Sequence, residues 1–453
     1  MAKQFDGDST KPSDNPSRQR ASAPTLGIHW AFPDFRAPRA LPTNRPITLG
    51  RGEECDVVLP GTEISRRHAE LRRSGSTLSI RDLESVNGVF VRGVQLHESP
   101  LIEGDVVRLG EWVGVVAAIQ DSDPTPPFAR IAPNLLGGPT LARALELGLR
   151  AAKSNLPVLI QGETGTGKEL TARAIHELSG RDGPFIGINC AALPEALAEG
   201  ELFGYRRGAF TGAQAAHVGH FRAAQRGTLL LDELTDLSLP VQAKLLRVLE
   251  ERRVVPLGES TPIALDVRVI AATQQPLADA VLEKRFRADL FARLDGLTIK
   301  LPPLKERPED IGYLVHELVQ KHAGGKAIAI DPLLIERLCL HDWPFNLREL
   351  DLLIRRLLVL HAHEPRLLLE HLPERVRDPL EAEAKSHRPG ALSRDELELS
   401  QLVAQLRRHK GNLARAAAEI GISRQRAYRL VESRGDLELE SFRNDPSKDV
   451  DKP

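Results

Sequence analysis

Short apolar runs broken by glycine, asparagine and proline fill the segment from about residue 25 to 120. They include PITLG, DVVLP, LSIRDL, GVFVRG and DVVRLG. Runs of strand length at this spacing favour a β-sandwich. Before them, residues 1–24 are rich in Ser, Pro, Asp and Arg and are expected to be a disordered tail. After them, the Pro-rich stretch 121–130 reads as a linker.

Helical and strand-like patterns alternate from about residue 131. LARALELGLRAAKS and KELTARAIHELS have helical periodicity, whereas PVLIQG, TLLLDE and VRVIAAT read as buried strands. This alternation is typical of a parallel α/β sheet. From about residue 301 the pattern becomes helical, with PEDIGYLVHELVQKH, PLLIERLCLH and NLRELDLLIRRLLVLH, which predicts a helical lid on the α/β core up to residue 378.

The segment after residue 378 is predicted to hold a small helical domain. A charged linker over 379–392 precedes three short helical pieces over 393–435, and an acidic tail over 436–453 is expected to be disordered. The whole chain is therefore expected to be multidomain, with a β-sandwich, an α/β core with its lid, and a small all-α domain.

Composition narrows the classes of function. A length of 453 residues suits roughly three domains of ~150 residues each. The net charge of −1 requires any nucleic-acid surface to be a local patch. Three scattered cysteines without CxxC spacing argue against disulfides or zinc and fit a reducing compartment. No apolar run approaches the ~18 residues that span a bilayer, and the first residues lack an apolar signal region. We therefore expect a cytoplasmic protein without membrane contact.

The first chemical motif is GETGTGK, which follows a strand and opens a helix. In this context glycine lets backbone N–H groups converge on phosphate oxygens, and a lysine reaches the β and γ phosphates. The next position usually holds Ser or Thr as a Mg²⁺ ligand, but here it is Glu169, so a merely structural turn stays open from this motif alone. The residues expected to bind nucleotide are Gly162, Glu163, Thr164, Gly165, Thr166, Gly167, Lys168 and Glu169.

The second motif is TLLLDE, an apolar strand that ends in two acids. Asp232 can hold the Mg²⁺ shell, while Glu233 can polarise an attacking water. Helix capping is the structural alternative for such a pair. Both motifs in this order predict an ATPase that uses ATP with Mg²⁺. Arg287 and Arg293 could serve a neighbouring subunit's site, although spacing alone reads them, like Arg348, as surface charges.

Seven motifs follow one another between about 131 and 378: GETGTGKE, NCAALPE, ELFGYRRGAFTGA, GTLLLDEL, FRADLFARL, LPPLKERPEDI and WPFNLREL. By these motifs the core resembles the AAA+ domain of bacterial enhancer-binding proteins, the activators of sigma-54 RNA polymerase. In that family Lys-Glu is the normal form, which accounts for Glu169. The GAFTGA loop, which alone would read as a hairpin turn, is the family's sigma-54 contact. Its residues are Gly208, Ala209, Phe210, Thr211, Gly212 and Ala213.

The resemblance also implies roles for single residues. Asn189 would couple to Glu233 as a switch, Thr273 would be the first sensor and Arg348 the second, and Arg287 and Arg293 would act in trans in a homo-oligomeric, hexameric ring. Two positions depart from the family pattern. Gln274 replaces an Asn, which questions nucleotide sensing. Phe345 replaces a Gly, which suggests altered lid geometry because Gly positions often need backbone angles that Phe resists.

The predicted sandwich carries Gly50-Arg51, Ser65-Arg-Arg-His68 and Asn87-Gly88 at loops between its strands. Arginine, serine and asparagine at sandwich loops can form an anion site with charge-assisted hydrogen bonds. With these motifs the domain resembles a forkhead-associated (FHA) domain, a phosphothreonine-binding module, over about 26–119. By the resemblance, Arg51, Ser65 and Arg66 would hold the phosphate and Asn87 the peptide backbone. The position before Asn87 is often Thr but here is Val86, so binding could be weaker or different. His68 reads as a buried packing residue.

The last domain has a small-residue helix, a Gly turn and a basic helix, which predict DNA binding, although helical hairpins of interaction domains look similar. With this pattern the domain resembles a Fis-type helix-turn-helix. Residues 407–434 hold eight Lys and Arg against two Glu, the local basic patch that the total charge required. The candidate DNA-binding residues are Ser423, the expected helix cap, with Arg424, Gln425, Arg426, Tyr428 and Arg429.

Together these features predict an enhancer-binding ATPase that remodels the sigma-54 polymerase closed complex. The FHA domain implies control by a phosphothreonine protein from a Ser/Thr kinase pathway. An AAA+ remodeller of another protein or DNA substrate is the alternative. A scaffold without enzymatic activity is a third reading, which the Lys168, Asp232 and Glu233 set disfavours.

Overall fold

The computed structural model describes residues 25–36, 45–75, 77–119, 129–210 and 213–377. By contacts the chain divides into one unit over 1–372 and a second over 373–453. Of the second unit only the start is described, where α11 spans Glu374–Arg377. The expected helix-turn-helix domain, its linker and both expected tails lie outside the described residues.

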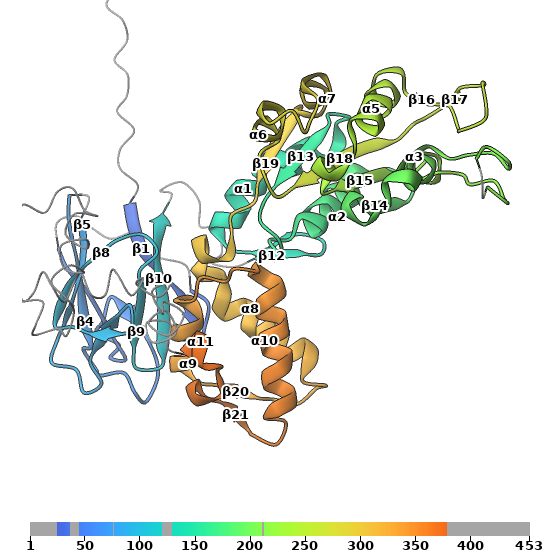
Figure 1. The fold of residues 1–453 in the computed structure, drawn as a ribbon. Helices are drawn as coiled ribbons and strands as arrows, with labels where there is room; N and C mark the ends of the chain where they lie inside the picture. Colours follow the sequence, from blue (N-terminus) through green and yellow to red (C-terminus); the bar gives the residue numbers. More distant parts are fainter. Residues whose placement is uncertain (1–24, 37–44, 76, 120–128, 211–212, 378–453) are drawn as a thin grey trace, which may run out of the picture. The chain divides into compact units, whose positions relative to one another are not determined.

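The first domain is a sandwich of two five-stranded sheets, as the apolar runs predicted (Figure 1). One sheet has the order β1-β10-β9-β6-β7 and the other β3-β2-β4-β5-β8. Their inner faces enclose one apolar cluster, in which the rings of Trp30 and Trp112 meet edge to face, 5.8 Å apart. The strands are β1 Thr25–Phe32, β2 Ile47–Gly50, β3 Val57–Val58, β4 Ala69–Ser74, β5 Thr77–Asp82, β6 Val89–Val91, β7 Val94–Gln95, β8 Glu98–Leu101, β9 Val106–Leu109 and β10 Trp112–Ile119.

The second domain is a parallel sheet with the order β14-β15-β18-β13-β19, covered by helices on both faces (Figure 1). The strand alternation places Leu229 and Leu231 in one apolar cluster with α3, α5, α6 and α7, and Leu230 in another with α1 and α2. The elements are α1 Pro139–Arg150, β13 Val158–Gln161, α2 Lys168–Ser179, β14 Phe185–Asn189, α3 Glu195–Phe203, α4 His220–Ala223, β15 Thr228–Asp232, α5 Leu239–Glu251, β18 Arg268–Thr273, α6 Leu277–Leu282, α7 Ala288–Leu294 and β19 Leu297–Lys300.

Three two-stranded sheets complete the described chain. The pair β11 Ala129–Ala132 and β12 Leu135–Gly137 precedes α1, so a strand begins in the last two residues of the expected linker. The hairpin β16 Arg253–Val254 and β17 Ile263–Ala264 follows α5. In the lid, β20 Ala329–Ile330 pairs with β21 Arg366–Leu367.

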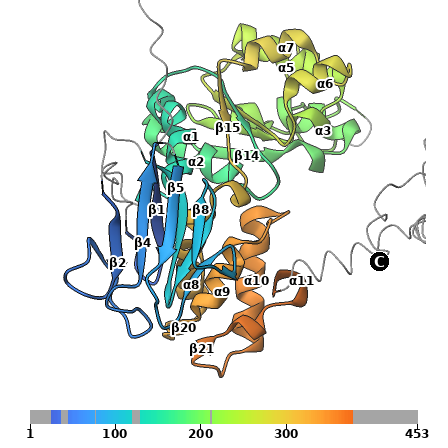
Figure 2. The same ribbon diagram turned by 90° about the vertical axis from the view of Figure 1, so that its left-hand side faces the viewer.

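Periodicity predicted three helices in the lid, and the structure has a helix at each of these places (Figure 2). They are α8 Ile311–His322, α9 Pro332–Cys339 and α10 Asn346–Leu360. Proline at the first position of α9 needs no N–H partner, and Asp331 caps this helix by accepting from the Leu333 N–H at 2.8 Å.

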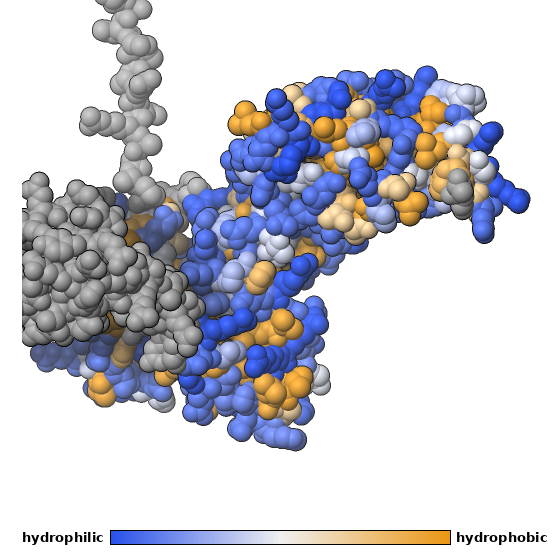
Figure 3. Space-filling model, viewed as in Figure 1, coloured by the Kyte–Doolittle hydropathy of each residue, from blue (hydrophilic) through white to orange (hydrophobic). Residues whose placement is uncertain are grey.

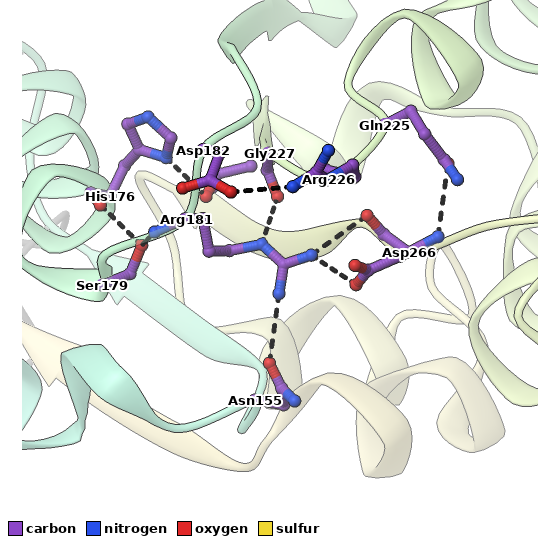
Figure 4. A network of polar contacts seen from close by, with 10 residues as sticks. Asn155, His176, Ser179, Arg181, Asp182, Gln225, Arg226, Gly227 and Asp266 are labelled. Carbon is purple, nitrogen blue, oxygen red and sulfur yellow. Dashed lines mark hydrogen bonds and ion pairs between the residues drawn. The ribbon is translucent and has the colours of Figure 1, made fainter.

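Arg181, in the turn after α2, ties together the amino ends of three strands (Figure 4). Its guanidinium donates to the Gly227 carbonyl before β15 at 2.9 Å and to the Asn155 side chain before β13 at 3.3 Å. It also donates to the Asp266 carbonyl before β18 at 3.0 Å and pairs with the Asp266 carboxylate. These contacts fix the amino ends of the strands, and the GETGTGK turn (the P-loop) follows the opposite, carboxyl end of β13.

No helix among the described residues is long and apolar enough to cross a membrane. The face drawn in Figure 3 is mostly hydrophilic, with apolar patches scattered over the core and lid.

Candidate functional site

The P-loop joins β13 to α2, as its position in the sequence predicted. Gly165 and Gly167 have φ of +80° and +106°, the left-handed region that glycine adopts without strain. The Thr166 hydroxyl donates to the Glu163 carbonyl at 2.8 Å and closes the turn. Lys168 is only 7% exposed, and its ammonium donates to the Gly162 carbonyl at 3.0 Å. The turn, its glycines and this lysine fit the phosphates of a nucleotide.

The acidic pair lies at the carboxyl end of β15, beside the P-loop lysine. Glu233 has φ of +52°, a left-handed conformation unusual for a residue with a side chain. Its carboxylate lies 3.5 Å from the Lys168 ammonium. Its backbone N–H donates to Asp232 at 3.0 Å. Burial raises the pKa of Asp232 above its usual range, and the charge of Lys168 opposes that rise.

Glu233 accepts a hydrogen bond from Gln274 at 2.8 Å. Asn189 lies opposite Asp232 in the β14–β15 ladder, but its side-chain oxygen accepts from the Ala191 N–H at 2.9 Å. Gln274 was notable in the sequence only as a departure from the family pattern. In the structure it is the amide that contacts Glu233.

Thr273 is fully buried at the end of β18, where its backbone carbonyl accepts from the Gly162 N–H at 3.1 Å. Its hydroxyl is occupied within its own turn, donating to the Gln275 carbonyl at 2.9 Å. The structure therefore brings the expected first sensor to the P-loop through its backbone.

The lid closes on the P-loop through the start of α10. The Leu347 N–H donates to the Gly165 carbonyl at 3.0 Å. A Cβ on Gly165 would lie 2.3 Å from the Phe345 carbonyl oxygen and 3.3 Å from the Arg348 Cβ. The Cβ atom of Arg348, the expected second sensor, therefore lies beside the P-loop.

Phe345 adopts φ of −114°, which any residue can take, so this position does not need a backbone angle that Phe resists. That Phe345 alters the geometry of the lid stays a prediction. The left-handed conformations fall instead on Trp343 and Asn346, at +51° and +52°. Asparagine tolerates this region better than most residues.

Two buried residues of the lid junction were not singled out in the sequence. Asn346 accepts from the Leu304 N–H at 2.6 Å and donates to the Glu163 carboxylate at 3.1 Å and the Thr164 carbonyl at 3.0 Å. Arg307 donates to the Thr166 carbonyl at 3.2 Å. Both lie in motifs of the family resemblance, WPFNLREL and LPPLKERPEDI, which were the available signal.

The two candidate trans arginines lie on the surface at α7, as spacing alone suggested. Arg287 forms a two-point ion pair with Asp289, at 3.0 and 2.6 Å. Arg293 donates to the Leu249 carbonyl at 3.1 Å. Neither contacts the P-loop of its own chain.

The GAFTGA loop is closed at its base. The Gly208 N–H donates to the Ala213 carbonyl at 2.9 Å, and the Ala213 N–H to the Phe210 carbonyl at 3.0 Å. Phe210 is 38% exposed and its ring meets Tyr205 edge to face at 5.0 Å. Thr211 and Gly212 lie outside the described residues.

In the sandwich, the loops that carry the predicted phosphopeptide residues meet. The Arg51 N–H donates to the Ser65 carbonyl at 3.0 Å, and Asn87 donates to the Glu63 carbonyl at 2.8 Å. The side chains of Arg51, Arg66 and Asn87 are exposed.

His68 is fully buried, as expected, and links two of these loops. One ring nitrogen accepts from the Ser65 N–H at 3.1 Å, and the other bonds the Gly88 carbonyl at 3.1 Å. Burial lowers the pKa of His68, which favours the neutral ring that this pairing needs. Val86 is 90% exposed beside this surface.

Four family descriptions match the chain in order. They are the FHA domain over 47–110, the Sigma-54 interaction domain over 137–300, the AAA+ ATPase lid domain over 305–389, and the bacterial regulatory protein, Fis family, over 393–429. The chain is 41% identical over 311 residues to the transcriptional regulatory protein GlrR of Escherichia coli, covering 67% of this chain and 68% of GlrR. The chain belongs to the sigma-54-dependent transcriptional regulators.

Other members of this family match over shorter shares of their length. The chain is 45% identical over 298 residues to the putative uric acid sigma-54-dependent transcriptional regulator UacR of E. coli, covering 62% of this chain and 50% of UacR. It is 44% identical over 294 residues to the regulatory protein AtoC of E. coli, covering 62% of this chain and 64% of AtoC.

Among solved structures, NtrX from Brucella abortus in complex with ATP is similar, with a TM-score of 0.50 and 32% identity. The similarity covers 67% of this chain and 70% of NtrX. The expected multidomain fold class, with FHA sandwich, AAA+ core and helix-turn-helix domain, is confirmed.

Proposed function

We propose that this regulator binds enhancer DNA through its Fis-type domain and hydrolyses ATP to remodel the sigma-54 polymerase closed complex. The observation that carries the proposal is the joint presence of the Lys168–Glu233–Asp232 cluster and a GAFTGA loop in one domain. An ATPase that remodelled another substrate would need the catalytic cluster but not the GAFTGA loop.

The chain's residues fit the steps of phosphoryl transfer. The P-loop amides would bind the β and γ phosphates, and Lys168 would leave the Gly162 carbonyl for a phosphate oxygen. Glu233 would orient the attacking water. Among the described residues no group of three or more His, Cys, Asp or Glu could hold a metal ion, so Mg²⁺ at Asp232 would take its other ligands from ATP and water. When bound, Mg²⁺ neutralises phosphate charge.

The remaining roles complete the proposal. Arg293 is exposed and the Arg287 side chain is 40% exposed, so both are accessible to a neighbouring subunit, in line with a hexameric ring and trans-acting arginines. Arg348 would sense the γ-phosphate from the lid, and Thr273 and Asn189 would relay the nucleotide state. The exposed Phe210, with Thr211, would contact sigma-54. The DNA contacts, in the cytoplasm, would come from Ser423, Arg424, Gln425, Arg426, Tyr428 and Arg429.

The input we propose is a phosphothreonine protein from a Ser/Thr kinase pathway. Arg51, Ser65, Arg66 and Asn87 lie on loops that meet at one end of the sandwich, and both arginines are exposed. Phosphate would find there two guanidinium groups suited to charge-assisted hydrogen bonds.

The deciding experiment is promoter opening by purified sigma-54 polymerase, with ATP and DNA carrying enhancer sites. Lys168→Ala should lose both hydrolysis and opening, whereas Phe210→Ala should keep hydrolysis and lose opening. Val218→Ala, which removes another exposed apolar side chain after the same loop, is the control. A protein that hydrolyses ATP but opens no sigma-54 promoter would instead be a remodeller of another substrate.

A further inference from the structure

The FHA sandwich and the lid meet at a buried ion pair. Arg108, in β9, donates to the Glu336 carboxylate of α9 at 2.6 Å, and the two side chains are only 10% and 6% exposed. The two residues are 228 positions apart in the sequence. Charged groups are rarely buried unless paired, so each of these two needs the other domain to stay in place.

The sandwich and the lid also approach each other closely through their backbones, where β1 meets α8. A Cβ on Gly312, near the start of α8, would lie 2.1 Å from the Ala31 carbonyl oxygen at the end of β1. Next to it, the rings of Tyr313 and Phe35 meet edge to face at 5.0 Å. Gly312 costs helix stability relative to alanine. Here the missing side chain is what lets the sandwich approach the helix.

We infer that the outer face of the β1–β10–β9 sheet is a docking surface for the lid of the same chain, and that this contact carries the state of the phosphopeptide loops to the P-loop. The coupling to the phosphopeptide loops rests on the proposed phosphothreonine input, whereas the docking of the sandwich on the lid does not.

On the sandwich side, the connection runs along β6. Asn87 precedes this strand, and Phe90 pairs with Arg108 across the β6–β9 ladder. The Arg108 guanidinium stacks over the Phe90 ring, 3.8 Å from its centroid. Phe90 is three positions after Asn87 and contacts Arg108, so a conformational change in the Asn87 loop can shift the ion pair.

On the lid side, the connection runs from α9 to the P-loop. The Leu338 carbonyl, two residues after Glu336, accepts from the Trp343 indole at 3.0 Å. Trp343 lies three residues before Asn346, whose side chain bonds the P-loop at Thr164. Release of α9 would thus loosen the lid where it clamps the nucleotide loop.

The docking contact is suited to release. The second Glu336 carboxylate oxygen is buried and has no hydrogen-bond partner among the described residues. Desolvating a carboxylate without satisfying both oxygens costs free energy, so the pair specifies the docked arrangement more than it stabilises it.

The test is amide hydrogen exchange of the full-length protein with three variants. Gly312→Ala should favour a free α8, because alanine is the better helix former, but should disrupt a docked one. We expect it to speed exchange at least tenfold in β1 as well as α8. Glu336→Gln, which keeps the side-chain volume, should do the same in β9 and α9. Asp351→Asn, which weakens the contacts of Asp351 with His322 and Arg355 elsewhere on the lid, is the matched control and should leave β1 and β9 unchanged.

The docking would be overturned by the following result. Gly312→Ala slows exchange in α8 and leaves β1 unchanged, and Glu336→Gln exchanges at the same rates as Asp351→Asn. A second arm adds a phosphothreonine peptide selected from a degenerate library, with its unphosphorylated form as control. We expect faster exchange in α9 of the wild type and little further change in Gly312→Ala. A peptide that binds without affecting α9 would overturn the coupling. If no phosphopeptide binds, the proposed input fails while the variants still decide the docking.

Discussion

The buried Asn346 side chain holds the lid on the P-loop, and its removal gives a prediction with a calculable size. Asn346→Ala deletes three hydrogen bonds, to Leu304, Glu163 and Thr164. At about 1 kcal/mol each, their loss costs about 3 kcal/mol. Alanine at φ of +52° adds about 1 kcal/mol, because its Cβ disfavours the left-handed region. Asn346→Gly loses the same bonds without this strain.

The assay is hydrogen exchange at the Leu304 and Leu347 amides, which bond Asn346 and Gly165 respectively. If local opening of the lid governs exchange, about 4 kcal/mol corresponds to roughly 10³-fold faster exchange for Asn346→Ala. Asn346→Gly should lie about fivefold to tenfold below it. Asp351→Asn, elsewhere on α10, serves as the control. A change under tenfold in Asn346→Ala, or equal rates for the alanine and glycine variants, would refute the reasoning.

Three further predictions concern the core and the sandwich. Gln274→Leu should lower the turnover of ATP about tenfold with little change in its KM, because Glu233 loses its amide donor; steady-state kinetics that show a KM effect alone would contradict this. Gly165→Ala should weaken ATP binding at least tenfold, since its Cβ would meet the Phe345 carbonyl and strain the loop; calorimetry that finds wild-type affinity would contradict it. Burial, together with the charge of Arg143, lowers the pKa of His29 from 6.5 to about 4. The stability that the neutral His29 ring contributes is therefore present above pH 6.5 and is lost as the pH falls toward 4. His29→Leu should remove up to about 3 kcal/mol of that loss, as measured by denaturant unfolding across this pH range, and an unchanged pH profile would contradict it.

Much of the fold was readable because burial imposes periodicity. The run TLLLDE became β15 and NLRELDLLIRRLLVLH became α10, since strand alternation and helical spacing record which faces are covered. The P-loop was equally readable, because its glycines are required by backbone angles that other residues resist.

What the sequence could not supply were contacts set by side-chain torsions and tertiary placement. Gln274 differs from the family's Asn by one methylene, yet only the folded chain shows its amide on Glu233. Asn346 and Arg307 are single polar residues that belong to no periodic pattern, so the sequence did not indicate that they are buried. Their burial depends on the contact of the lid with the P-loop. Phe345 was expected to alter the geometry of the lid because it replaces a Gly; its own φ is ordinary and a neighbour takes the unusual angle, so that expectation stays a prediction. Predictions for Ser423 to Arg429 and for Thr211 stay predictions, because these residues lie outside the described chain.

The strand order of the core has a consequence for synthesis on the ribosome. β13, which carries the P-loop, pairs only with β18 and β19, both far downstream. At ~5–20 residues per second, β18 is made roughly 5–20 s after β13. During that interval an apolar parallel strand has no partner on either edge, whereas the sandwich already has all its strands. Nascent chains halted between about residues 170 and 260 should therefore depend on chaperones, and chains extended past β19 should not.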